Sequence, residues 1–172
     1  MARAKAQQAI DSGGAFDMHK TDPNQLADFA ANKTGVEGKR ISGELSGMSA
    51  KDFAAKMGDE VNAGKCTKKS VAFDGPPPQT MDVYEYPDGT VVRHKPLGDN
   101  YRSGPAYSVE VKKDPSMPDL GKDDAAFKVT STGKAVPKGP FEVKNPYPKG
   151  SAQYREFERA VMNAGHHSLP SS

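Results

Sequence analysis

The stretch from Met81 to Lys113 constrains the fold of this chain more than any other. It reads MDVYEYPDGTVVRHKPLGDNYRSGPAYSVEVKK and contains three short runs with the alternation typical of β-strands, at 81–86, 90–95 and 106–112. Pro-Asp-Gly at 87–89 separates the first two runs. Proline presets a turn dihedral, aspartate bonds back to its own backbone, and glycine accepts a positive φ, so this tripeptide predicts a hairpin.

Alternation along these runs decides which side chains share a sheet face. Arg93 and Lys95 fall on one face of the second run, whereas His94 falls on the other. The polar positions of the third run include Glu110 and Lys112. If the runs pair, one face gathers a carboxylate among several cations, with His94 at its rim, which suits acid–base chemistry on a phosphate ester. The same pattern also fits a solvated sheet face held by cross-strand ion pairs.

Helical patterns lie on both sides of this stretch. Residues 22–35 and 49–62 each begin with an N-capping residue and carry apolar side chains at helical spacing. Residues 151–163 form the clearest amphipathic pattern, again with an N-capping serine. We expect the first two helices to cover one face of the sheet and the last helix to close the fold.

Shorter patterns complete the expected architecture. Residues 2–10 favour a short helix, and the triple proline at 76–78 predicts a stiff, extended connector into the hairpin. Residues 126–130 indicate a fourth strand, and 141–144 an edge strand or extended segment. The predicted fold class is α+β, with N-terminal helices, a twisted antiparallel sheet of about four strands and a closing C-terminal helix.

Composition limits the classes of function. The net charge is only +2, which is no strong polyelectrolyte pattern, and the single cysteine rules out an internal disulfide framework. No apolar run approaches the length of a membrane span, so we expect no membrane contact. The phosphate-binding, dinucleotide, serine-hydrolase and zincin motifs are all missing, so we expect no cofactor.

Three histidines deserve comparison with metal sites. His94, His166 and His167, together with an acidic residue, have the chemistry to bind a transition metal. Their spacing does not require one, and adjacent histidines often point in opposite directions. We therefore expect no metal at the site.

The run from Tyr86 to Lys113, about a sixth of the chain, resembles the C-terminal toxin domains of bacterial polymorphic toxins. In such domains a DGxVVRxKPxGD segment precedes an arginine, a proline and an alternating strand. The matching positions here are 88–93, Lys95-Pro96, Gly98-Asp99, Arg102 and Pro105. The resemblance implies secretion or delivery into the cytoplasm of a target bacterium by a contact-dependent inhibition, Rhs or type VI system.

Many of the resembling domains are metal-independent RNases, with tRNA as a usual target. The patterns along the chain predict a leader or linker at 1–22 and one domain at 23–172, with a helical part at 23–65 and the sheet and closing helix at 80–167. The resemblance implies that this domain is a toxin. It also implies a cognate immunity protein, which we expect to be acidic. We expect the domain to be a monomer.

Metal-free cleavage at a ribose 2′-OH needs a base, an acid and cations around the phosphate. We expect Glu110 or His94 to be the base, and His94 or a C-terminal histidine to be the acid. Arg93 and Lys95 complete the expected catalytic set by holding the phosphate together with Arg102, and a tyrosine is expected to stack a base. The expected substrate-binding residues are Tyr101, Arg102, Tyr107, Lys112, His166 and His167.

Two other classes of function stay open from the sequence. One is a different effector enzyme on the same delivery platform, such as a DNase or an ADP-ribosyl transferase. The other is a non-catalytic binding module of a secretion apparatus.

Overall fold

The structure is a computed structural model that describes residues 1–15, 36–112, 126–140 and 143–171. The helix predicted at 22–35 and the start of the segment predicted at 141–144 lie outside these ranges. The side chain of Lys112 is also outside the description.

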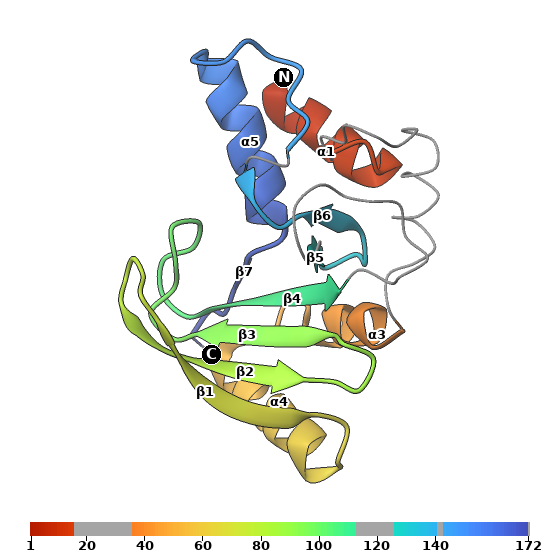
Figure 1. Cartoon of the computed structure of the whole chain (residues 1–172), viewed down its shortest axis with the longest axis vertical. Helices are drawn as coiled ribbons and strands as arrows, with labels where there is room; N and C mark the ends of the chain where they lie inside the picture. The colour runs from red at the N-terminus through yellow and green to blue at the C-terminus, as the bar shows by residue number, and fades with distance from the viewer. Residues whose placement is uncertain (16–35, 113–125, 141–142, 172) are drawn as a thin grey trace.

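An antiparallel sheet is the centre of the fold, and it has seven strands in the part of the chain that the structure describes (Figure 1). Six strands neighbour one another in sequence order, and β7 pairs with β4. The strands are β1 (Thr67–Phe73), β2 (Gln79–Glu85), β3 (Val91–Lys95), β4 (Ala106–Lys112), β5 (Ala126–Val129), β6 (Ala135–Pro137) and β7 (His167–Ser168). The α+β class is confirmed, whereas the expected count of about four strands is wrong.

The hairpin between β2 and β3 forms where the sequence predicts it. The two strands pair antiparallel, with Tyr84 opposite Val92. In the turn, the backbone N–H of Thr90 donates to Asp88 Oδ1 at 2.9 Å, and Gly89 has a φ of +90°. Both the hydrogen bond and the positive φ follow from the turn preferences of Pro-Asp-Gly.

The three unexpected strands lack a strong local pattern. β1 is exposed along most of its length, so no apolar alternation marks it. Residues 74–78 reverse the chain between β1 and β2, which pair along their whole length, so the extended polyproline connector is wrong and the prolines lie in a turn. β6 ends at a proline at the edge of the sheet path, and β7 is two residues long.

Four helices are described: α1 (Ala2–Ser12), α3 (Val36–Leu45), α4 (Ala50–Asn62) and α5 (Ala152–Ala164). The serine caps are confirmed, because Ser49 and Ser151 each accept a backbone N–H at 3.1 Å from the third residue after them. Figure 1 shows α3 and α4 behind strands β1–β4, and α1 beside α5 at the other end of the molecule.

Two apolar clusters hold these layers together. The larger joins α3 and α4 to the rear sheet face, which carries Tyr84, Val92, Tyr107 and Val109. The smaller joins α1 to α5 and β6, and it buries Ala2, Ala6 and Ile10 against Phe157 and Val161. Residues 2–12, within the segment expected to be a leader or linker, therefore pack as part of this fold.

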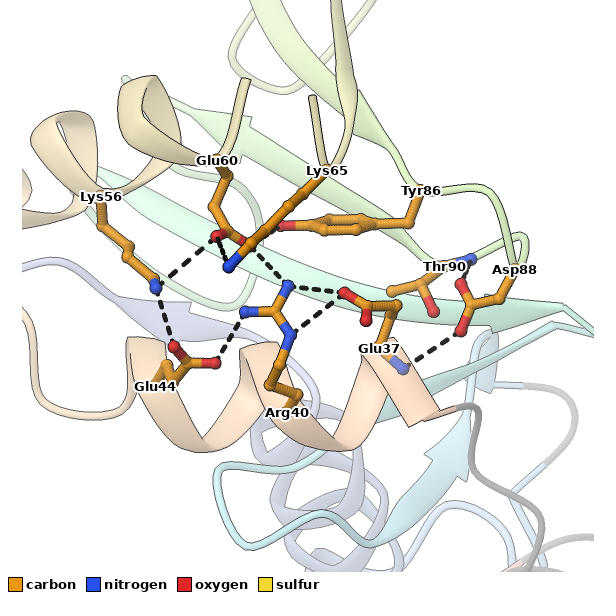
Figure 2. A network of polar contacts seen from close by, with 9 residues as sticks. All are labelled: Glu37, Arg40, Glu44, Lys56, Glu60, Lys65, Tyr86, Asp88 and Thr90. Atoms are coloured by element: carbon orange, nitrogen blue, oxygen red, sulfur yellow. Dashed lines mark hydrogen bonds and ion pairs between the residues drawn. The ribbon is translucent and has the colours of Figure 1, made fainter. Parts of the chain in front are cut away.

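A polar network ties the two helices of the larger cluster to the hairpin (Figure 2). Arg40 of α3 ion-pairs with Glu60 of α4 at 2.6 Å, and the Tyr86 hydroxyl donates to the same carboxylate at 2.8 Å. Burial opposes ionisation, but these hydrogen bonds lower the pKa of Glu60 to about 2. The backbone N–H of Glu37 also donates to Asp88 at 3.1 Å. The network thus fixes the position of α3 and α4 behind the sheet.

Candidate functional site

Polar side chains gather on the sheet face that points away from α3 and α4. We call Arg93, Lys95, Ser108, Glu110 and Lys128 the polar sheet face. Strand register puts them together, because Arg93 lies opposite Ser108, and Glu110 lies opposite Lys128. No described helix crosses the front of β1–β4 in Figure 1.

Glu110 is the centre of this face. Glu110 is only 5% exposed, and its carboxylate forms a close ion pair with Arg93. Lys138, which follows β6, reaches the other carboxylate oxygen at 2.9 Å, and Lys128 lies at 4.0 Å. Both oxygens of Glu110 are therefore engaged by cations, and one negative charge is shared among three positive groups.

Lys128 is a member of the site that the sequence analysis missed. It is 6% exposed, and its ammonium group donates to Ser108 Oγ at 3.0 Å. Burial, reinforced by the positive charges of Lys95 and Arg93, lowers the pKa of Lys128 to about 7. Lys128 lies between Phe127 and Val129, so strand alternation predicts that it points to the face opposite these core residues. Only the strand register, however, places it opposite Glu110.

Lys128 should make stability depend on pH above neutrality. Its pKa is about 7 in the folded protein and 10.5 ordinarily, so the unfolded chain holds a proton that the folded chain releases in this window. The contribution of Lys128 to stability therefore rises from pH 7 towards 10.5 and is lowest below pH 7. We expect the free energy of unfolding in urea to be higher for Lys128→Met than for wild type at acidic pH. This difference should become smaller at alkaline pH. An equal difference at both ends would contradict the lowered pKa.

A carboxylate–imidazole pair borders the polar sheet face. Asp99, in the connection between β3 and β4, accepts backbone N–H groups from Tyr101 and Arg102 at 2.8 and 3.0 Å. Its other oxygen lies 2.8 Å from His166 Nδ1 and 3.6 Å from Lys95 Nζ. Although burial opposes ionisation, the His166 contact and the backbone donors hold the pKa of Asp99 well below its usual range. The carboxylate is thus charged, and Nδ1 of His166 donates to it.

The second ring nitrogen of His166 has no such partner. Nε2 is buried and makes no hydrogen bond within the described ranges. Burial and the positive charge of Lys128 lower the pKa of His166, although Asp99 acts in the opposite direction. At neutral pH the imidazole is therefore uncharged, and with its proton on Nδ1 it keeps a free lone pair on Nε2.

Gly165 brings His166 close to the polar sheet face. A Cβ atom at position 165 would lie 2.8 Å from Lys128 Cβ and 2.9 Å from a Val136 methyl. Only glycine allows the end of α5 to approach the sheet this closely. The end of α5 therefore lies directly against Lys128 of β5, and the charge of Lys128 is close enough to act on His166.

The other sequence candidates divide between this site and the rear of the sheet. Arg102 donates to the backbone oxygens of His166 and Asn163 at 2.7 and 2.9 Å, so it caps the end of α5. The Tyr101 ring centre lies 4.5 Å from that of His166, so Tyr101 belongs to this site. Tyr107 is buried on the rear face, where His167 packs on it at 4.9 Å. Its ring is therefore enclosed by protein.

His167 is held by the backbone. Its Nε2 donates to the Val129 carbonyl at 2.9 Å, and burial lowers its pKa to about 4. This imidazole is neutral at pH 7 and takes part in the packing of the rear face. The two adjacent histidines thus have different environments.

His94 lies on the rear face, away from Arg93 and Glu110. Its Nδ1 is 3.1 Å from Asp82 Oδ2, and its ring packs 5.0 Å from that of Phe53. A cavity of about 240 Å³ borders this pair and is also lined by Tyr84 and Lys68. The structure therefore does not bring His94 together with the polar sheet face.

Two absences concern the part of the chain that the structure describes. Within it, no three His, Cys, Asp or Glu side chains cluster as metal ligands do. Within the same ranges, no helix has the length and apolar character that a bilayer crossing requires.

Comparison with known proteins adds no family assignment. No protein-family model matches the chain. Searches of curated proteins and of solved structures also find no match. The geometry of the polar sheet face and of the Asp99–His166 pair is therefore what a functional proposal must build on.

Proposed function

We propose that this chain is an antibacterial toxin domain that cleaves RNA without a metal ion. The observation that carries the proposal is the Asp99–His166 pair: Asp99 also contacts Lys95 of the polar sheet face, and Nε2 of His166 has no hydrogen-bond partner among the described residues. A carboxylate that orients an imidazole, next to several cations, supplies both a base and charge stabilisation for a phosphate. The resemblance of the Tyr86–Lys113 run to polymorphic toxin domains supports the same function.

The geometry suggests a role for each group. His166 Nε2 accepts the proton of the ribose 2′-OH, and the 2′-oxygen then attacks the adjacent phosphorus. Arg93 and Lys95 balance the charge that develops on the phosphoryl oxygens. Charged Lys128, whose pKa lies near neutrality, gives a proton to the departing 5′-oxygen. The products are a 2′,3′-cyclic phosphate and a free 5′-hydroxyl.

Glu110 holds the cations in this scheme and is not the base. Arg93 and Lys138 engage its two oxygens, so neither is available to a hydroxyl group. Substrate entry also requires a movement, because Nε2 of His166 is closed to solvent. The Tyr101 ring, 4.5 Å from the imidazole, would have to swing aside.

Purified protein should cleave RNA, tRNA being the first substrate to try, in the presence of excess EDTA. Every proposed role belongs to a side chain, so removal of divalent ions should leave the rate unchanged. Gel analysis of the fragments should show 2′,3′-cyclic phosphate ends. Loss of cleavage in EDTA with recovery on added zinc or magnesium would contradict the proposal.

Expression in bacteria separates the proposal from a non-catalytic role. A ribonuclease toxin produced without its immunity protein should arrest growth, with degraded RNA in the arrested cells. Normal growth of cells that accumulate folded protein and keep intact RNA would instead support a binding module. Growth arrest with intact RNA would support another effector enzyme, such as a DNase.

A further inference from the structure

A cleft of about 560 Å³ lies between α1 and α5. Its walls carry three arginines, Arg3 from α1 and Arg155 and Arg159 from α5, and one acidic residue, Glu156. The pair between Arg3 and Glu156 is long, at 3.5 Å, and both side chains are exposed. Such a pair is weak in water, so the cleft keeps a positive excess.

The cleft adjoins the proposed catalytic site. The Arg159 guanidinium lies 5.1 Å from the Tyr101 ring centre and donates to the Asn100 carbonyl at 2.6 Å. The Tyr101 ring in turn packs 4.5 Å from the imidazole of His166. An extended ligand with one end at His166 would therefore have its next segment beside Arg159.

A residue in the wall of this cleft carries a buried acceptor without a partner in the described part of the chain. Asn163 lines the cleft, and its side-chain Oδ1 is buried without a hydrogen-bond partner among the described residues. A buried carbonyl oxygen without a donor is costly, which favours a ligand that supplies one. A base amino group is a suitable donor.

We propose that the cleft between α1 and α5 binds the phosphodiester backbone of the RNA strand that flanks the bond to be cleaved. This inference rests on the proposed ribonuclease function. Guanidinium groups recognise phosphates through paired hydrogen bonds, and they also stack on bases. The three arginines match the repeated phosphates of an RNA strand, and the Asn163 acceptor matches a base amino group.

The test uses a fluorescent 2′-O-methyl oligoribonucleotide, which lacks the attacking hydroxyl and is not cleaved. The cleft variant is Arg3→Glu/Arg155→Glu, which spares Arg159 and its contact with Tyr101. The control is Lys51→Glu/Lys68→Glu, which makes the same charge change at two exposed positions away from the cleft. Fluorescence anisotropy at several salt concentrations gives Kd for each protein.

We expect the cleft variant to bind at least about tenfold more weakly than wild type at low salt, because two phosphate contacts are lost. The slope of log K against log salt should fall by about 1.4, since each contact to a single strand contributes about 0.7. The control should stay close to wild type in both quantities. Equal weakening of both variants, or no measurable binding by wild type, would overturn the inference.

Two further outcomes separate this inference from the ribonuclease proposal. Cleft-dependent binding by a protein that cleaves no RNA would retain the cleft as an RNA-binding site and reject the enzymatic function. In the second outcome, the cleft variant binds RNA as wild type does but loses affinity for polyglutamate. This result would overturn the inference and assign the cleft to an acidic protein segment.

Discussion

Replacement of Glu110 by glutamine should destabilise the protein by about 3–5 kcal/mol, the usual cost of removing one partner from a buried ion pair. The change preserves the size of the side chain but removes the charge that compensates Arg93, Lys138 and Lys128. These groups would then repel one another, and water screens this repulsion least at Lys128, whose side chain is 8% exposed. Urea unfolding measures the loss directly.

Glu85→Gln is the matched control for this prediction. Glu85 belongs to the same sheet face and pairs with Lys69 at 2.5 Å, but its side chain is 44% exposed. Water screens such a pair, so the change should cost under about 1 kcal/mol. Similar costs for the two variants would show that Glu110 is only a surface ion-pair partner. A much larger cost for Glu110→Gln would support a stabilising role for this carboxylate.

Replacement of His166 by asparagine should lower RNA cleavage on the order of 100-fold or more, the usual contribution of a positioned general base. The asparagine amide nitrogen can take the place of Nδ1 and keep the hydrogen bond to Asp99. It has no atom in the place of Nε2, so the proposed base is lost while the hydrogen bond to Asp99 remains. Cleavage rates and the free energy of unfolding should be measured on the same preparation.

The pH dependence of cleavage gives an independent check on His166. The base must be uncharged, and its pKa is lowered from 6.5, so wild-type activity should fall only as the pH drops into the acidic range. Activity should fall again above about pH 7, where Lys128 loses the proton that it would donate. The acidic limb should disappear in His166→Asn.

His94→Asn is the control that separates the two imidazoles. His94 has its own carboxylate partner, Asp82, but it lies on the rear face beside a separate cavity. We expect this variant to keep most of the cleavage activity. Strong loss in His94→Asn, with normal activity in His166→Asn, would move the site to the rear cavity.

Local sequence was enough to predict several parts of this molecule. The turn at 87–89 depends on the dihedral preferences of three residues, and the helices at 50–62 and 152–164 depend on a capping serine and an apolar stripe. Alternation along β3 and β4 places Arg93 with Glu110 and separates His94 from both. Each of these features rests on contacts within one segment or between neighbouring strands.

Register and long-range packing determined the rest. Lys128 meets Glu110 only because β5 pairs with β4 in one particular register, and Asp99 meets His166 across 67 positions of sequence. These pairings are decided by how much apolar surface distant segments bury together, a free energy that no single segment carries. The polar sheet face was therefore predictable in part from its strands, whereas the partners of His166 and Lys128 depend on the tertiary fold.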